Sequence, residues 1–280
     1  MLALIALFAW TSALSQTVVT DDLGRSLTFD RTPTRIVSLA PSITETLFAL
    51  GAGERIVGVT DYCDYPEEAR SKEKVGGLVN PSIEKILSLK PDLIIMTTEG
   101  NLKDDFNHLE EFGILLFVTN PRTLNGIYKS ITDLGLLTGE TGHAGTIVGR
   151  MQSRVDSIRA LHTRRKKAML AVSLLPLMAV GRGTFLAEVL DLAGGENIAA
   201  STGLTYPTLS REAVLASDPE VLVLPSDIFL PQEDLLRLYP EWKDLRAVKN
   251  GKVFSVDSDL ISRPGPRVID GLEALNRLFR

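Results

Sequence analysis

Hydrophobic and polar positions follow the same order in two distant stretches of the chain, residues 82–96 (SIEKILSLKPDLIIM) and 210–224 (SREAVLASDPEVLVL). In the first stretch Ile83, Ile86 and Leu87 recur at helical spacing, and a proline then ends the helical pattern, as it does in the second. Each stretch closes on a short apolar run, which is typical of a strand covered on both faces. The two stretches align without a gap, so the sequence predicts the same helix–strand unit twice.

A second pair of similar segments lies in the same order along the chain, residues 47–56 (LFALGAGERI) and 189–198 (VLDLAGGENI). Each segment ends a helical pattern at glycines and continues with Glu and Ile. Two pairs of similar segments in the same order along the chain indicate two similar lobes. The distance between the copies is far too long for a solenoid, whose repeats are about 20 to 50 residues long.

Outside these segments, short apolar runs alternate with helical spacings, which predicts two α/β lobes with central parallel sheets. The expected strands are residues 35–39, 56–59, 93–96, 114–118, 168–175, 178–180, 221–224 and 253–256, preceded by a hairpin at 17–29. The expected helices are residues 43–50, 103–112, 124–137, 144–167, 184–192 and 267–279, besides the two in the repeats. We expect Asn80 and Pro81 to start the helix of the first repeat, as its cap and first residue.

Residues 144–167 contain no proline, and apolar residues recur there at spacings of three and four. A helix of this length extends about 35 Å at 1.5 Å per residue, which is longer than a small lobe needs. We therefore expect an amino-terminal lobe at residues 16–138, a rigid linking helix at 139–167 and a carboxyl-terminal lobe at 168–280.

The composition agrees with two globular lobes. The 280 residues suit two domains of ordinary size, and a hydrophobic content of 44% is enough for buried cores. A net charge of −5 argues against a nucleic-acid partner, and the single cysteine, Cys63, excludes a disulfide within the chain. We expect the protein to be a monomer.

The first 14 residues (MLALIALFAWTSAL) are apolar and uncharged. This run is too short to span a membrane, which takes about 20 residues. Small residues at Ala13 and Ser15 suit a signal peptidase, although the usual positive charge at the start is missing. We expect residues 1–15 to be a cleavable signal peptide of a periplasmic protein, and the alternative is a buried amino-terminal helix.

Catalytic and metal-binding motifs are weak in this sequence. Cys63 has no histidine in a recognisable partner motif, so it is a poor candidate nucleophile. The three histidines are scattered, which argues against a metal site made by the protein alone. The glycines at 51 and 53 follow a helix instead of preceding one, which is the wrong context for binding phosphate. We therefore expect a protein that is not an enzyme and holds no metal or cofactor of its own.

Ligands of open α/β sheets bind in crevices outside the carboxyl ends of the strands. Here the loops at those ends carry Tyr62, Tyr65, Tyr206, Asp259 and Arg263. Each residue alone is equally compatible with a turn or a surface contact. Their placement at matching ends of both halves favours a cleft, and rings beside a few polar groups suit a large organic ligand.

At these residues the chain resembles the periplasmic binding proteins of ABC importers that carry siderophores, haem and metals. The similarity spans residues 35–279. It rests on RIVSLAPSITETLFALG, SIEKILSLKPDLII, GGENI and YPTLSREAVL, while DYCDYP and SDLISR are more similar to the cobalamin-binding branch. The resemblance implies two lobes joined by one helix, with the ligand held between them.

The resemblance also implies which positions line the ligand cleft: Ser42, Tyr62, Leu78, Thr98, Met178, Tyr206, Asp259 and Arg263. Three of them, Leu78, Thr98 and Tyr206, stand where the best-known cobalamin binder has tryptophan. Met178 stands where that protein has phenylalanine. Fewer rings give less flat apolar surface for a corrin, so the ligand class is implied more strongly than the individual ligand.

Glu84 and Glu212 occupy the two positions that, by the same resemblance, dock on arginines of the permease dimer. An acid in the first turn of a helix also complements the helix dipole, which is worth about 0.3–1 kcal/mol. The resemblance thus implies capture of cobalamin or another corrinoid and its delivery to an ABC permease with its ATPase. A ferric siderophore or haem is the alternative ligand, and a secreted enzyme using Asp64 and Asp259 is the alternative of a different class.

Overall fold

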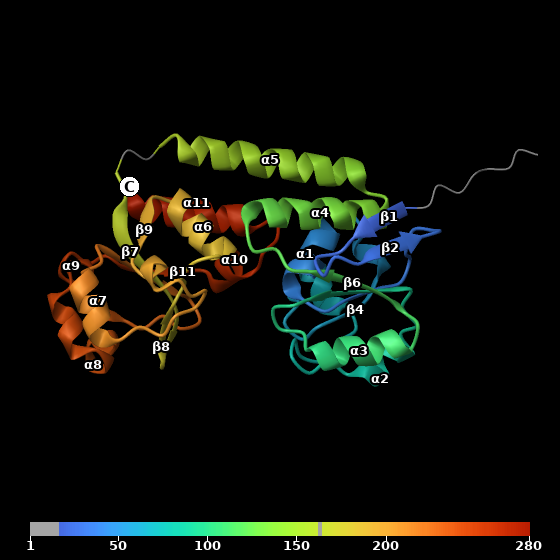
Figure 1. The fold of residues 1–280 in the computed structure, drawn as a ribbon, viewed down its shortest axis with the longest axis horizontal. Coiled ribbons are helices and arrows are strands. Elements are labelled where there is room, and N and C mark those ends of the chain that lie inside the picture. Colours follow the sequence, from blue (N-terminus) through green and yellow to red (C-terminus); the bar gives the residue numbers. More distant parts are fainter. Residues whose placement is uncertain (1–16, 162–163) are drawn as a thin grey trace, which may run out of the picture.

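The computed structural model describes residues 17–161 and 164–280, which form two α/β lobes lying side by side beneath one helix (Figure 1). The predicted fold class, with a central parallel sheet in each lobe, is confirmed. The signal peptide expected at residues 1–15 lies outside the described residues. No helix in the described part of the chain is long and apolar enough to cross a membrane.

The amino-terminal lobe is built on a four-stranded sheet whose strands are all parallel. In spatial order the strands are β4 (Ile56–Val59), β3 (Ile36–Ser38), β5 (Leu93–Thr97) and β6 (Leu115–Thr119). The helices of this lobe are α1 (Pro41–Ala49), α2 (Ile83–Ser88), α3 (Lys103–Glu111) and α4 (Leu124–Thr138), with short 3-10 turns at Gly53–Arg55 and Glu67–Ser71. The hairpin of β1 (Thr17–Thr20) and β2 (Ser26–Phe29) packs against α4.

The carboxyl-terminal lobe is built on a mixed sheet. Its strands are β11 (Val253–Val256), β10 (Val221–Pro225), β7 (Lys166–Leu174) and β8 (Leu177–Ala179), with β9 (Gly195–Asn197) also paired to β7. Only β8 runs antiparallel to its neighbour. The helices are α6 (Phe185–Leu192), α7 (Arg211–Ser217), α8 (Gln232–Leu238), α9 (Arg246–Lys249), α10 (Ser258–Ser262) and α11 (Val268–Phe279), with 3-10 turns at Ala200–Thr202 and Pro240–Asp244.

The lobes are joined by α5 (Thr141–Arg159), which turns back over α4 at Gly139 and lies above both lobes in Figure 1. The sequence predicts that this helix runs to residue 167, and that prediction is wrong at its carboxyl end. Lys166 and Lys167 belong to β7 instead, because the Lys166 amide donates to the Gly194 carbonyl (3.0 Å) and the Lys167 carbonyl accepts from the Glu220 amide (2.8 Å). Helical periodicity alone does not exclude Lys166 and Lys167 from the helix, but pairing within the sheet places them in a strand.

One hydrophobic core runs through both lobes. It starts on the face of the amino-terminal sheet with Ile36, Ile95 and Phe117, continues through buried residues of α4 and α5, and reaches Leu170 and Val223 of the other sheet. The outer face of each sheet has a separate core beneath α2 and α3 or beneath α7 and α8. Because the lobes share a close-packed interior, a change in their relative position would break apolar contacts.

The two sequence repeats fold alike. Each helix begins directly after a serine, and the side chain of that serine accepts a hydrogen bond from the backbone amide three residues later. Ser82 accepts from Lys85 N (3.3 Å), and Ser210 accepts from Ala213 N (3.1 Å). The expectation that Asn80 and Pro81 start the first helix is therefore wrong. The serine side chain satisfies an amide that has no partner within the helix, and this fixes the start two residues later than the proline indicates.

Candidate functional site

The ligand residues predicted in the amino-terminal lobe lie near the carboxyl ends of its strands. Tyr62 follows β4 and is exposed, and Thr98 follows β5 and is also exposed. Leu78 lies in the loop before α2, where its carbonyl accepts from the Asn101 side chain (2.8 Å) and its side chain packs over Gly100. The loops carrying Leu78 and Thr98 are therefore joined to each other.

Ser42 is the second residue of α1 and is half-buried. Its carbonyl accepts from the Thr46 hydroxyl (2.7 Å). A Cβ placed on Gly265 of the carboxyl-terminal lobe would lie 3.3 Å from the Ser42 carbonyl oxygen, so the two lobes touch at this point. Such a contact is tight, so the close approach of the backbones favours a glycine here.

In the carboxyl-terminal lobe, Met178 and Tyr206 come together. Met178 lies in β8, and the backbone after Tyr206 pairs with that strand, where the Ala179 amide donates to the Pro207 carbonyl (3.1 Å). Burial and then the charge of Glu99 raise the pKa of the half-buried Tyr206 hydroxyl. The Tyr206 side chain also packs against the hydrophobic core that runs through both lobes.

Arg263 joins the two lobes through its guanidinium. Its Nη1 donates to Glu45 Oε1 (2.9 Å) of α1 and to Asp64 Oδ1 (2.8 Å) of the loop after β4. Its Nη2 forms an ion pair with Asp259 Oδ1 (2.7 Å) one helical turn earlier. Arg267 holds the same Glu45 through two hydrogen bonds, 2.8 and 2.6 Å long. We call these five residues the Arg263 cluster.

The residues of the Arg263 cluster differ in how deeply they are buried. The side chain of Glu45 is 2% exposed and that of Arg263 12%, whereas those of Asp64 and Asp259 are 46% and 38% exposed. Burial acts to raise the pKa of Asp64, but the hydrogen bond and charge of Arg263 outweigh it, so the pKa lies below its ordinary value of 3.8. Burial raises the pKa of Asp259 above its ordinary value, although Arg263 opposes the shift. The groups that reach solvent are thus the two aspartates.

Sequence reasoning brought Tyr62, Asp259 and Arg263 to one place, and the structure does join them: the Tyr62 carbonyl also lies 3.5 Å from Arg263 Nη2. It missed Glu45 and Arg267. The available signal was a single charged residue in an otherwise uncharged helical stretch, SITETLFAL, because a buried carboxylate requires a cationic partner. Arg267 carried no such signal.

Thr98, like Leu78, Met178 and Tyr206, has no hydrogen bond or ion pair with the Arg263 cluster among the described residues. It lines a cavity of about 480 Å³ with mainly apolar walls, between the turn of the β1–β2 hairpin and the start of α3. Leu23 and Leu102 form exposed parts of that wall. No contact joins Thr98 to the Arg263 cluster among the described residues.

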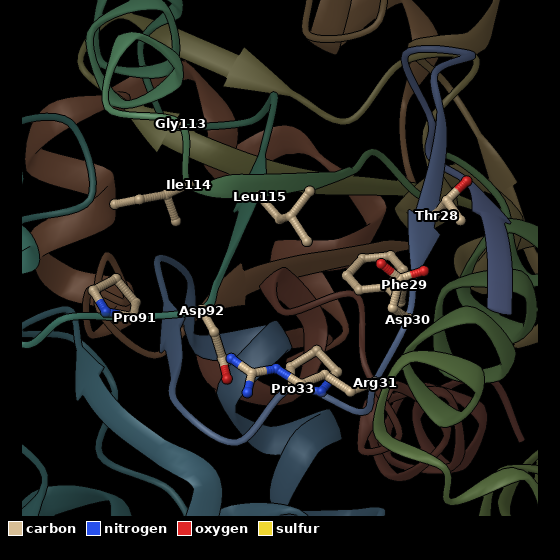
Figure 2. A pocket seen from close by; sticks show the side chains of 10 residues that line it. All are labelled: Thr28, Phe29, Asp30, Arg31, Pro33, Pro91, Asp92, Gly113, Ile114 and Leu115. Carbon is tan, nitrogen blue, oxygen red and sulfur yellow. The ribbon is translucent and has the colours of Figure 1, made fainter. Parts of the chain in front are cut away.

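Another cavity, of about 510 Å³, lies at the amino ends of β5 and β6 and is shown in Figure 2. Asp92 and Leu115 line it together with Phe29 of β2. The Asp92 carboxylate already accepts from the Thr34 and Arg35 amides, 2.9 Å each at the closest. This cavity opens at the end of the strands opposite to the predicted ligand loops, so we do not regard it as the ligand site.

Glu84 and Glu212 are each the second residue of their helix, α2 and α7, and both are exposed. Neither carboxylate has an ion-pair or hydrogen-bond partner in the part of the chain that the structure describes. In Figure 1 both helices lie away from α5, one on each lobe. The two acids are thus free to meet a partner on the face opposite to the linking helix.

Comparison with known proteins gives a consistent family. The model of a family described as periplasmic binding protein matches residues 36–260. An uncharacterized ABC transporter substrate-binding lipoprotein of Bacillus subtilis, YvrC, is 33% identical over 92% of this chain and 83% of its own length. The vitamin B12-binding protein of Vibrio parahaemolyticus is 30% identical over 88% of this chain and 90% of its own.

Solved structures with the same fold bind more than one kind of ligand. The periplasmic vitamin B12-binding protein BtuF of Vibrio cholerae superimposes with a TM-score of 0.78 at 30% identity, covering 88% of this chain and 96% of that one. The periplasmic heme-binding protein RhuT of Roseiflexus sp. RS-1 superimposes with a TM-score of 0.80 at 27% identity, covering 88% and 97%. The fold therefore does not by itself select the ligand.

Proposed function

This chain belongs to the periplasmic binding protein family of ABC importers, and from that premise we propose that it captures cobalamin or another corrinoid between its two lobes. Proteins of this family bind the ligands that their transporters carry, have no cofactor of their own, and work with a permease and an ATPase. In this proposal the protein acts as a monomer outside the inner membrane and delivers the ligand to the permease.

The observation that carries the proposal is the convergence of both lobes on one polar and aromatic site. Arg263 of the carboxyl-terminal lobe contacts Asp64 and the Tyr62 carbonyl of the other lobe, and the side chain of Tyr62 is exposed. Half-buried Tyr206 packs against the core that runs through both lobes. Rings with a few fixed polar groups suit a large amphipathic ligand. The relatives named as vitamin B12-binding proteins, which are about 30% identical, support a corrinoid in particular.

Haem or a ferric siderophore is the second candidate ligand. The specific observation in favour of haem is the heme-binding protein of Roseiflexus, which matches nearly the whole described chain as well as the B12-binding structure does. Leu78, Thr98 and Met178, which are not aromatic, stand at positions implied to line the cleft, and this is compatible with a ligand other than a corrinoid.

Titration calorimetry with cyanocobalamin tests the ligand. We expect one binding site per chain and a change in the visible spectrum of the corrinoid. Haemin and a ferric hydroxamate serve as competing ligands under the same conditions. Absence of heat and of spectral change at about 100 µM cyanocobalamin, together with binding of haemin or the siderophore, would overturn the corrinoid assignment.

We also propose that Glu84 and Glu212 dock the protein on the permease. A permease dimer presents the same pocket twice, and a binder with two similar lobes meets it with one acid from each. Two exposed carboxylates at the same position of equivalent helices, neither with a partner among the described residues, support this role. Arginine and carboxylate form directional bidentate pairs, so arginines of the permease are the expected partners.

The proposed boundaries of the mature protein follow from the same function. Residues 1–15 would direct export, residues 16–138 and 168–280 would form the two lobes, and 139–167 would connect them. Mass spectrometry of the protein recovered from the periplasm should give a first residue of Gln16. A mature chain that still begins at Met1 would contradict cleavage.

A further inference from the structure

We propose that Asp64 is a ligand-contacting residue and that buried Glu45 is its positioning residue, so that this side of the site accepts ligands with amide N–H groups and rejects ligands with carboxylates there. The inference rests on the corrinoid-binding function proposed above, and it adds which chemical groups of the ligand the site selects. Its basis is the arrangement of the Arg263 cluster.

The terminal N–H groups of Arg263 face acceptors of the protein. Nη1 is shared between Glu45 and Asp64, and Nη2 between Asp259 and the more distant Tyr62 carbonyl. Each Nη carries two hydrogens, so Nη1 donates both of its hydrogens to protein carboxylates. The guanidinium is also largely buried, which places it behind the aspartates. A ligand that reaches this point meets the carboxylates of Asp64 and Asp259.

The two aspartates come from opposite lobes, and the common arginine fixes their separation. Asp64 lies in the loop after β4, and Asp259 lies in the first turn of α10. Ionised carboxylates only accept hydrogen bonds. Primary amides at the edge of a ligand supply the matching N–H donors, whereas ligand carboxylates at the same positions are repelled.

Glu45 holds this arrangement from the buried side. Its carboxylate forms ion pairs with both Arg263 and Arg267, and the segment between those arginines packs on α1 at Gly265. The guanidinium of Arg267 also lies over the Tyr65 ring, 3.8 Å from its centre. With three carboxylates and two guanidinium groups the cluster has a net charge of −1. Without the charge of Glu45, Arg263 would form ion pairs with Asp64 and Asp259 only. We expect the oxygens of these aspartates then to turn toward Arg263 and away from the ligand.

The experiment compares two forms of one ligand, cyanocobalamin and a corrinoid whose side-chain amides have been hydrolysed to carboxylates. The wild-type protein should bind the amide form at least about tenfold more tightly, the value expected for hydrogen bonds to a charged group. Asp64→Asn should weaken binding of the amide form and lower the ratio of the two affinities. Asp61→Asn is the matched control, because Asp61 is exposed in the same loop and has no ion pair among the described residues.

Glu45→Gln should lower the same affinity ratio, and the double variant with Asp64→Asn should lower it no further, since one residue acts through the other. A purely structural role of Glu45 would weaken both ligands equally and leave the ratio unchanged. Thermal unfolding monitors each variant. If Glu45→Gln does not fold, Arg263→Lys provides the second test, because lysine keeps the charge but not the planar fork, and it should also lower the ratio.

The outcomes separate the inference from the function. Tight binding of cyanocobalamin with an affinity ratio near one, or an Asp64→Asn variant that behaves as Asp61→Asn does, would overturn the inference and leave the corrinoid function standing. Failure of the wild-type protein to bind either corrinoid would overturn the proposed function, and the inference with it.

Discussion

Lys90 and Asp218 are the two residues other than glycine with positive φ in the described structure, 47° and 44°, and they occupy the same position in the two repeats. Each directly precedes the proline between helix and strand, where the chain turns sharply out of α2 or α7. The residue at this position is lysine in the first repeat and aspartate in the second. The backbone conformation is nevertheless the same, so the equivalence of the repeats lies in the turn more than in the side chains.

The first prediction concerns this turn. Lys90→Gly should stabilise the protein by about 0.5–1 kcal/mol. A lysine in the left-handed region costs roughly 1–2 kcal/mol, which glycine avoids, but part of this benefit is lost because glycine raises the conformational entropy of the unfolded chain. Asp218→Gly should not stabilise it, since the Asp218 carboxylate binds the Arg246 amide (2.9 Å) and Nε (2.6 Å). Urea unfolding measures both free energies. Equal effects of the two substitutions would contradict the argument.

The second prediction concerns docking. Glu84→Ala and Glu212→Ala should each reduce ligand-stimulated ATPase activity of the reconstituted transporter, and the double variant should nearly abolish it. Ligand affinity should not change, because neither residue lies near the Arg263 cluster. Calorimetry and ATPase assays on the same preparations measure the two quantities.

The matched control for docking is Glu233→Ala. Glu233 is also exposed and is also the second residue of its helix, α8, so its loss has the same effect on a helix dipole. It should leave ATPase stimulation intact. If the double Glu84/Glu212 variant still shows normal ligand-stimulated ATPase activity, the docking role of the two glutamates is contradicted, and they serve only at the ends of their helices.

The third prediction concerns the ligand anchor. Tyr206→Ala should weaken corrinoid binding by about 1–3 kcal/mol, the range for an aromatic anchor in an interface. Tyr206→Phe keeps the ring and should retain most of the affinity. Calorimetry of both variants decides whether the ring or the hydroxyl matters, and an unaltered affinity in Tyr206→Ala would remove Tyr206 from the site.

The fourth prediction concerns motion between the lobes. Small-angle scattering should give nearly equal radii of gyration with and without ligand, because three features oppose a hinge. One core continues through both lobes, α5 covers both, and the Arg263 cluster joins α1 to the carboxyl-terminal lobe. The Leu124 amide of α4 also donates to Glu188 of α6 (2.8 Å). A decrease of several ångströms on ligand binding would show that these contacts open.

The fifth prediction concerns pH. The hydrogen bond from Arg154 of α5 (2.8 Å) and its charge hold the pKa of Glu273 below its ordinary value of 4.5. A lowered folded pKa means that the pair stabilises the protein above pH 4.5 and that this stability is lost as the pH falls through the folded pKa. Arg154→Ala should cost up to about 1 kcal/mol at pH 7, because the pair is partly exposed. The difference from the wild type should shrink as the pH falls below 4.5, and a constant difference would contradict the assignment.

The sequence by itself determined the fold class and the equivalence of the two halves. The alternation of short apolar runs with helical spacings is local information, and it placed strands such as β5 and β10 within a residue of their bounds. It also placed Tyr62, Asp259 and Arg263 beyond the carboxyl ends of strands, since turn signals mark those segments. The expectation that Asp259 lies in a loop is wrong, because Ser258–Ser262 form the short helix α10.

Only the tertiary structure decided where α5 ends and what Arg263 does. Lys166 and Lys167 have no helix-breaking neighbour, and their pairing with β9 and β10 is a long-range event that no local pattern contains. In the same way, Glu45 and Arg263 lie 218 residues apart in sequence, and only the packing of α1 against the end of α10 brings them together. A charge inside an apolar helix shows that a partner is required, but which of the chain's arginines provides it depends on how the lobes pack.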